Sequence, residues 1–356
     1  MPVQGNGITA LFPGLLGPQP ELPRVEPGSR PDLGPLETLL SRAVMSSTAS
    51  EPAGQALDRE LGRVLEIPVA ARRDFPWAAL GGIADGLDTA DGWWLRLDPV
   101  YLQLDRDALY LLASDELHLS REQSDALVTS LNAHFREQGW HIHAPHPQRW
   151  YLRLDQPADI HTTSLYAAFG HDVHTCLPAG PDQRRWHGWL NECQMLLAGH
   201  PVNAEREARA QMPVNSIWPW GGGMQPPSPD TAWRVIVADE PALQGWARLQ
   251  DIPCRSLAEG LPAGETGSLL LMDSACNEAR QLQDVYAWFD CASHLQRQYI
   301  VPLLAWLRAG TCQTLTLLDG DGRRWELTPR RLRSWWRGFR SGRRPIERFL
   351  LPAHCP

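Results

Sequence analysis

The chain has 356 residues, of which 43% are hydrophobic and 21% charged, and its formal net charge is −8. These values are typical of a globular protein with a sizeable core, and the length allows two domains. The sequence contains no run of about 18 apolar residues and no charged-then-apolar leader. We therefore expect no membrane span and no secretory signal, and we predict a cytoplasmic protein.

The composition also excludes some chemistry. All 33 basic residues are arginine, so no lysine is present for a Schiff base with pyridoxal phosphate or for a Walker A loop. The seven cysteines are dispersed without CxxC spacing, which favours buried, reduced thiols over a disulfide framework. We predict no cofactor.

The first half of the chain shows strand and helix patterns in alternation. A short apolar run within Ile8–Leu16 predicts a first buried strand, and Trp93–Asp98 alternates with the period of two that is typical of a strand. Ser120 and Gln123 form a capping-box pattern, which predicts a helix that continues to about Phe135. The further strands predicted in this half are Ala108–Ala113, Gly139–His143 and Trp150–Leu154.

The second half alternates buried strands with helical patterns. The predicted strands are Trp233–Ala238, Ser268–Met272 and Thr314–Leu318, and the helical patterns between them are Pro241–Gln250 and Ala279–Arg308. Continuous apolar strands separated by helices indicate a parallel, mostly wound sheet. The predicted fold class is therefore α/β.

One stretch carries a more specific pattern. Asn191 to Gly223 reads NECQMLLAGHPVNAEREARAQMPVNSIWPWGGG, a helix stopped at His200-Pro201 and followed by polar side chains and three glycines. In this order the residues resemble the signature of the archaeal-type, cofactor-independent phosphoglycerate mutases of the alkaline phosphatase superfamily. The segment PWAALGGIADGLDTADGWWLRLDPVYL, which includes Gly81, Gly82 and Arg96, is similar to another stretch of that family.

The resemblance implies an alkaline phosphatase-like core with an inserted α+β domain that covers the substrate. The boundaries that we predict on this basis are core residues 1–92, an inserted domain at 93–223, core residues 224–330 and a basic C-terminal tail at 331–356. The more specific resemblance is to the bacterial regulatory protein RpfE type, which is often described as phosphoglycerate mutase-like. This resemblance covers most of the chain and implies a regulatory role.

The resemblance also implies a site for two divalent ions, held by Asp and His ligands at strand ends. Here Asn277 stands in place of a carboxylate, and Gln281 and Gly320 stand in place of histidines. Asp273 and Asp319 remain as isolated carboxylates, either as remnants of that site or as helix caps. We therefore predict no catalytic residues and no metal ligands. The spacings of His171–His174 and of His141, His143 and His146 are weak metal signals, and neither changes this prediction.

The resemblance is better retained at the residues expected to bind the substrate than at the expected metal ligands. We predict that one cleft beside Gly221–Gly223 binds a small phosphorylated or carboxylated metabolite, with Trp220 standing where the family has an arginine. The predicted ligand-binding residues are Arg96, His174, Asn191, Glu192, His200, Asn203, Arg206, Asn215 and Trp220. A structural alternative is open: Asn203 caps a helix, and Arg206 pairs with Glu192.

The C-terminal segment from Arg323 to Arg348 carries ten arginines against two glutamates, with Trp335, Trp336 and Phe339 among them. Such a segment suits a protein partner, an anionic surface or nucleic acid, or it is a solvated end that balances an acidic molecule. Because the chain as a whole is acidic, we do not expect nucleic acid as a partner.

Three hypotheses follow. The first is a non-catalytic regulatory protein, derived from a phosphoglycerate mutase, that retains a ligand-binding inserted domain. The second is an active phosphoglycerate mutase or phosphomonoesterase with an altered metal site. The third is an interaction protein that acts through its Arg/Trp tail.

Overall fold

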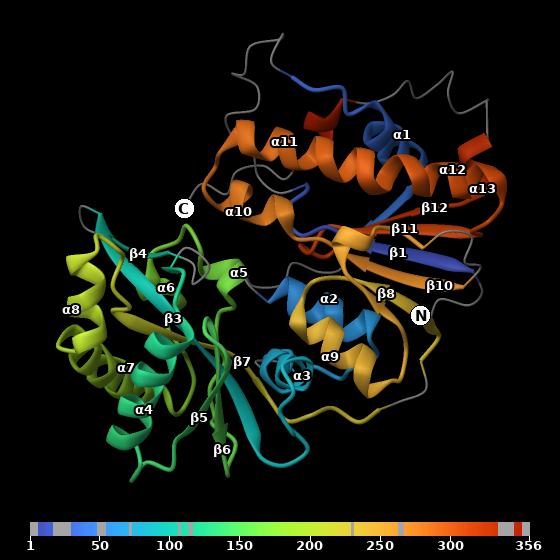
Figure 1. Cartoon of the computed structure of the whole chain (residues 1–356). Helices are drawn as coiled ribbons and strands as arrows, with labels where there is room; N and C mark the ends of the chain where they lie inside the picture. Colours follow the sequence, from blue (N-terminus) through green and yellow to red (C-terminus); the bar gives the residue numbers. More distant parts are fainter. Residues whose placement is uncertain are drawn as a thin grey trace. The chain divides into compact units, whose positions relative to one another are not determined.

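A computed structural model gives the fold of the chain (Figure 1). The structure describes residues 6–16, 30–47, 55–70, 73–105, 108–112, 117–228, 231–262, 267–333 and 345–350. By their internal contacts the residues form two compact units. The first unit comprises Met1–Pro52, Asp230–Glu240 and Gln250–Pro356, and the second comprises Ala53–Pro229 and Pro241–Leu249.

The first unit is built on a seven-stranded sheet with the order β2-β12-β11-β1-β10-β8-β9. Five neighbouring strands, from β11 to β9, are parallel, and β12 and β2 complete the sheet as antiparallel strands. The strands are β1 (Gly7–Leu11), β2 (Val44–Ser47), β8 (Trp233–Val237), β9 (Cys254–Arg255), β10 (Ser268–Met272), β11 (Thr314–Leu318) and β12 (Arg323–Leu327). The α/β class and the mostly parallel sheet predicted from the sequence are confirmed.

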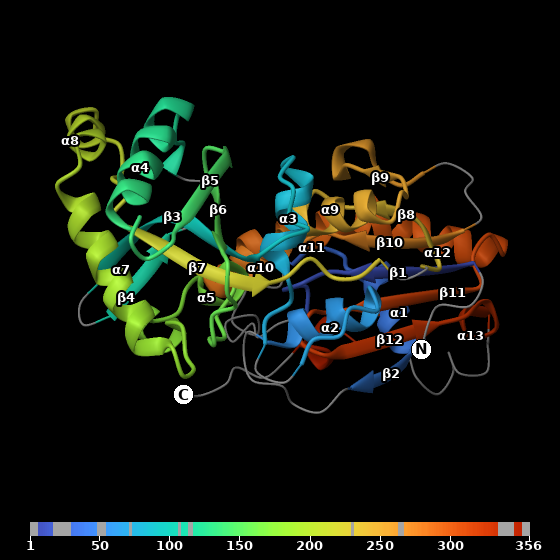
Figure 2. The ribbon, with the colours of Figure 1, turned by 90° about the horizontal axis from the view of Figure 1, so that it is seen from below.

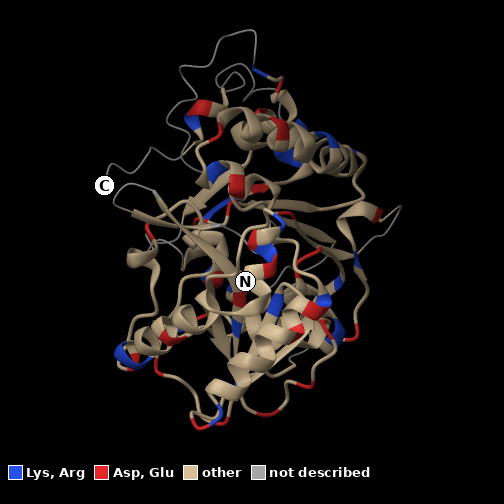
Figure 3. Cartoon of the chain, turned by 60° about the vertical axis from the view of Figure 1, so that its left-hand side comes forward, with Lys and Arg blue, Asp and Glu red and all other residues tan. Residues whose placement is uncertain are grey.

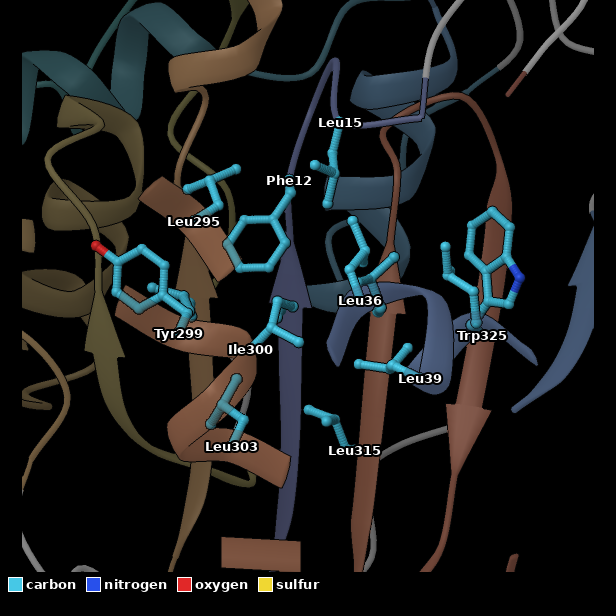
Figure 4. Close-up of a cluster of buried hydrophobic side chains, with 14 of the residues drawn as sticks. Phe12, Leu15, Leu36, Leu39, Leu295, Tyr299, Ile300, Leu303, Leu315 and Trp325 are labelled. Carbon is cyan, nitrogen blue, oxygen red and sulfur yellow. The ribbon is translucent and has the colours of Figure 1, made fainter. Parts of the chain in front are cut away.

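Helices cover one face of this sheet. They are α1 (Gly34–Arg42), α10 (Ala275–Gln281), α11 (Val285–Leu295), α12 (Val301–Ala309) and α13 (Pro329–Arg333), with 3-10 turns at Leu257–Glu259 and Ile346–Arg348. The buried core between helices and sheet includes Phe12 after β1, Leu36 of α1, Leu303 of α12 and Trp325 of β12 (Figure 4).

The single helical pattern predicted for Ala279–Arg308 is interrupted in the structure. Gln283 has a φ of 54°, and the Asp284 side chain accepts a hydrogen bond from Ala287 N, so that α11 starts afresh after α10. A π-helical turn, Gln296–Ile300, then joins α11 to α12. A local cap therefore overrides the continuous apolar pattern.

The second unit is built on a five-stranded antiparallel sheet. Its order is β4-β3-β6-β5, and β7 also pairs with β3, which is 13 residues long. The strands are β3 (Trp93–Asp105), β4 (Ala108–Leu112), β5 (His141–His146), β6 (Arg149–Leu154) and β7 (Ser216–Gly223). Its helices are α2 (Ala56–Val64), α3 (Trp77–Ala84), α4 (Arg121–His134), α5 (Leu165–Ala168), α6 (Val173–Cys176), α7 (Gln183–Ala198), α8 (Pro201–Ala208) and α9 (Pro241–Leu249).

The two faces of this sheet have different partners. The helices α4 and α7 lie over one face of the sheet (Figure 2). The core between them and the sheet includes Trp150 and Trp186. On the other face, Ala78 and Ala79 of α3 pack against Trp94 and Tyr151. The predicted capping box at the start of α4 is confirmed, because Ser120 accepts from Gln123 N and the Gln123 side chain bonds Ser120 N.

These contacts group the chain differently from the boundaries expected from the sequence. Residues 53–92 and 241–249, which the sequence assigned to the core, belong with the second unit. The reason is that α3 covers the antiparallel sheet and α9 packs directly on α3.

Two further features concern the surface. Acidic and basic residues are interspersed along the described ribbon (Figure 3). Among the described residues, no helix is long and apolar enough to cross a membrane.

The packing of α9 on α3 yields a stability prediction. A Cβ added at Gly245 of α9 would lie 1.8 Å from Leu80 O of α3, so we expect Gly245→Ala to destabilise the protein by about 1–3 kcal/mol or more. The matched control is Gly188→Ala in α7, where an added Cβ meets nothing within 4 Å. That change should be neutral or stabilise by up to about 1 kcal/mol. Urea unfolding of both variants checks this, and equal effects would contradict the α3–α9 packing.

Candidate functional site

The carboxyl edge of the parallel sheet is the candidate functional site of the first unit. Strands β8, β10 and β11 are each followed by a carboxylate, Asp239, Asp273 and Asp319 respectively. In open parallel α/β sheets, ligands bind at the carboxyl ends of the strands. The sheet therefore brings three acidic residues, far apart in the sequence, to the edge where chemistry is expected.

Each of these carboxylates already has partners within the chain. Asp239 accepts a hydrogen bond from Leu257 N at 3.0 Å, and Asp273 accepts one from Ala275 N at 2.9 Å. The hydroxyl of Tyr299, which lies in the π-helical turn, donates a hydrogen bond to Asp273. Burial raises the pKa of Asp273, with the negative charge of Asp239 as a smaller contribution in the same direction.

Asp319 is held by an arginine. It accepts from Asp321 N at 2.9 Å and Arg323 N at 3.0 Å, and the guanidinium Nε of Arg323 donates to it at 2.5 Å. The same guanidinium donates to Leu16 O and to Phe349 O, both at 2.6 Å. One cation of the chain thus lies against the carboxylate that follows β11.

The hairpin between β11 and β12 also explains why position 320 is not a histidine. Gly320 has a φ of +80° and Gly322 a φ of +87°, in the left-handed region that favours glycine. A Cβ at Gly320 would also lie 3.3 Å from Pro13 Cα. A histidine there would strain the turn that positions Arg323.

The end of β1 is apolar. Phe12 directly follows β1, is fully buried, and stacks on the ring of Tyr299 with centroids 5.9 Å apart (Figure 4). A packed aromatic ring therefore occupies the end of this strand, and residues 11–14 include no carboxylate. Within the described part of the chain, no group of three or more His, Cys, Asp or Glu side chains is arranged to hold a metal ion.

In the second unit, the predicted ligand residues fall into separate places. Arg96 and Trp220 are directly opposite each other on β3 and β7, and both bind Asp98. The guanidinium of Arg96 donates to Asp98 at 2.7–2.9 Å, and Trp220 Nε1 donates to the same carboxylate at 2.7 Å. The guanidinium carbon also lies 5.1 Å from the ring centres of Tyr151 and Trp220. Arg96 is therefore neutralised inside the protein.

Three other predicted residues form hydrogen bonds to backbone groups: Asn203, Arg206 and Asn215. Asn203 bonds Leu197 O and both the N and O of Val214, and Asn215 bonds both the N and O of Leu102. Arg206 is fully buried and donates to Met212 O, to Leu117 O and to the Gln123 side chain. These bonds tie α8 and the loop before β7 to β3 and to the start of α4.

The remaining predicted residues lie at the surface or at a helix start. His200 caps α8 by accepting from Val202 N, and its Nε2 is 2.9 Å from Ser130 Oγ. Glu192 is 3.1 Å from His134 in an exposed pair, rather than paired with Arg206. His174 and Asn191 are exposed, in α6 and α7.

The predicted cleft beside Gly221–Gly223 is not formed by these residues. Asn215 precedes β7 and Gly221 is six residues further along the strand, a separation of about 20 Å in extended chain. The space beside each of the three glycines is occupied by another side chain of the protein. A Cβ at Gly221 would lie within 3 Å of Trp77, one at Gly222 within 3 Å of Trp93, and one at Gly223 within 3 Å of Pro76. The prediction of one converging anion cleft is therefore wrong, because the polar side chains are used in structural hydrogen bonds.

The arginine-rich segment from Arg323 to Arg348 lies only partly within the described residues. Arg323 and Arg324 belong to β12, and Arg333 at the end of α13 donates to Arg308 O at 2.8 Å. Trp335, Trp336 and Phe339 lie outside the described residues.

Sequence reasoning missed a buried carboxylate pair in the second unit. Asp58 of α2 accepts from Phe75 N at 2.9 Å and from Trp77 Nε1 at 2.7 Å. Asp74 accepts from the N and Oγ1 of Thr162 and from Gly222 N. Burial, helped by the charge of Asp74, raises the pKa of Asp58 to about 7. Only the tertiary fold brings these partners together, and no sequence motif marks them.

The comparisons with known proteins point to one group. No family model matches the chain. Over 111 residues, 31% of this chain, the chain is 27% identical to the 2,3-bisphosphoglycerate-independent phosphoglycerate mutase of Methanosarcina acetivorans and 26% identical to that of Methanosarcina barkeri. The matched segment spans 28% of the length of these curated relatives.

Two solved structures match the chain at lower identity. A cofactor-independent phosphoglycerate mutase from Thermoplasma acidophilum is 16% identical with a TM-score of 0.38, over 91% of this chain and 90% of that one. A protein from Pyrococcus horikoshii is 12% identical with a TM-score of 0.47, over 91% of this chain and 87% of that one. The sequence matches support homology of part of this chain to the archaeal-type, cofactor-independent phosphoglycerate mutases.

The bonds of Arg206 predict a structural role for it. Arg206→Ala removes the side-chain donor to Leu117 O and Met212 O and one of the two donors to Gln123 Oε1, so we expect a loss of about 3 kcal/mol in the free energy of unfolding. Glu205→Ala, one residue away on the exposed side of α8, should change it by less than about 0.5 kcal/mol. Urea denaturation distinguishes the two. An unchanged stability of Arg206→Ala would make Arg206 a candidate ligand-binding residue again.

Asp58 predicts a pH dependence of stability. Its pKa is about 7 in the folded protein and 3.8 for an unperturbed aspartate, so the native state holds a proton between these values that the unfolded state has lost. This contribution to stability is complete below about pH 4 and is lost as the pH rises through 7, by at most about 4 kcal/mol. The variant Asp58→Asn should lack this component, whereas Asp125→Asn, an exposed control, should keep it. Parallel pH profiles for the wild type and Asp58→Asn would contradict the assignment.

Proposed function

We propose that the protein is a non-catalytic relative of the cofactor-independent phosphoglycerate mutases that acts as a cytoplasmic regulatory protein of the bacterial RpfE type. The similarity to archaeal mutases supports the relationship. The observation that carries the non-catalytic part is the placement of the Arg323 guanidinium against Asp319 at the carboxyl edge of the parallel sheet. The regulatory role itself comes from the resemblance of the sequence.

The donor set at this edge does not fit two divalent ions. Such ions need several anionic or imidazole ligands, and they activate the nucleophile and stabilise the developing charge. Here Asp319 is paired with a cation of the chain, and Asp273 accepts from a tyrosine hydroxyl and a backbone N–H. The backbone at position 320 has a positive φ that favours glycine, and the ring of Phe12 is packed at the end of β1.

The alternative, an active mutase or phosphomonoesterase with an altered site, has one observation in its favour. Asp239, Asp273 and Asp319 still follow neighbouring or near-neighbouring parallel strands. Oxygen ligands alone suit Mg²⁺. This alternative therefore needs a test that depends on these carboxylates.

The test is a mutase assay with 3-phosphoglycerate, with and without added Mn²⁺ or Mg²⁺. We expect turnover far below an ordinary enzymatic rate of about 1 per second, because the pairing of Asp319 with Arg323 removes the ligand set. The matched variant Asp273→Asn removes the carboxylate but keeps one oxygen that can accept from Ala275 N. The same trace activity in both proteins indicates a contaminant. Turnover near 1 per second that Asp273→Asn abolishes would overturn the proposal.

A further inference from the structure

Two cysteines from consecutive helices of the first unit meet in the folded chain. Cys276 lies in the first turn of α10, and Cys291 lies in the second half of α11. The positive φ at Gln283 and the Asp284 cap reverse the chain between the two helices, so that they pack against each other. The two thiols share a side-chain hydrogen bond.

Access differs between the two thiols. Cys276 is fully buried, whereas Cys291 is partly exposed. A reagent from solution therefore reaches Cys291 first. Cys276 is held directly beside it, in position to react second.

The hydrogen bond also makes the two thiols chemically different. It lowers the pKa of Cys291 to about 7 and raises the pKa of Cys276, where burial acts in the same direction. At Cys291, burial and the charges of Asp273, Asp290 and Glu278 oppose the shift. By contrast, burial raises the pKa of Cys312 to about 11. Because the thiolate is the nucleophile, Cys291 is the reactive member of the pair.

We propose that Cys291 and Cys276 form a reversible intramolecular disulfide by exchange with a small-molecule disulfide. The Cys291 thiolate attacks one sulfur of the reagent, whose S–S bond breaks and releases one thiolate. Cys276 then gives up its proton and attacks the Cys291 sulfur, which displaces the second thiol. Two protein thiols are oxidised, and one reagent disulfide is reduced to two thiols.

The link would act on the edge of the parallel sheet. The first turn of α10 packs against Gly14, where an added Cβ would lie 2.6 Å from Asn277 Cα. From α11, Trp288 Nε1 donates to Gly14 O at 3.2 Å. A disulfide between α10 and α11 therefore fixes both helices against the loop after β1. Closing a loop of about 15 residues should raise the thermal midpoint by on the order of 5 °C. This inference is independent of whether the protein is catalytic.

The test uses the full-length protein at pH 7 in a glutathione redox buffer, followed by alkylation and peptide mass mapping. We expect a Cys276–Cys291 cross-linked peptide that dithiothreitol removes, with a raised thermal midpoint before reduction. Cys276→Ser should stop at one glutathione on Cys291, because the second thiol is missing. Cys312→Ser, a buried control outside the pair, should still form the link.

A measurement on the wild type guards against variants that fail to fold. With limiting alkylating reagent at pH 7, Cys291 should react about tenfold or more faster than Cys312, since its thiolate fraction is much larger. No cross-link between Cys276 and Cys291, or a Cys291 no more reactive than Cys312, would overturn the proposal.

Discussion

The ion pair between Asp319 and Arg323 is the constraint on which the carboxyl edge of the first unit depends. The two residues lie at the two ends of the turn between β11 and β12, so the pair closes a hairpin. Through its other nitrogens, Arg323 also holds the carbonyls of Leu16 and Phe349. One side chain thus joins three segments that are far apart in the sequence. Removing either partner would leave a buried charge without compensation, which is costly.

The same arrangement recurs in the second unit with different residues. Arg96 pairs with Asp98 two residues further along β3, and Trp220 completes the bonds of that carboxylate. In each unit an arginine that could meet an anionic ligand is already neutralised by a nearby aspartate of the chain. A guanidinium in such a pair has a low affinity for a phosphate from solution. The phosphate must compete with the internal carboxylate, which loses no entropy of association.

Much of the fold could be predicted from the sequence, because strands and helices are encoded locally. The apolar runs at Ser268–Met272 and Thr314–Leu318 and the capping box at Ser120 need only neighbouring residues to be recognised. The site could not be predicted in the same way. Arg206 finds its acceptor at Leu117, and Asn215 finds its partner at Leu102, 113 residues earlier. Spacing within a motif gives no information on such partners.

The motif from Asn191 to Gly223 can therefore be similar to an enzyme's motif for structural reasons. His200 caps α8, Pro201 stands at its first position, Asn203 and Arg206 bind the loop that follows, and the glycines admit Trp77 and Trp93. Each residue is required by a packing or hydrogen-bonding need that remains whether or not a ligand binds. Such residues can thus preserve the scaffold of the second unit, whatever the chemistry at the carboxyl edge of the other sheet. For this chain, the pairing of Asp319 with Arg323 says more about catalysis than the retained motif does.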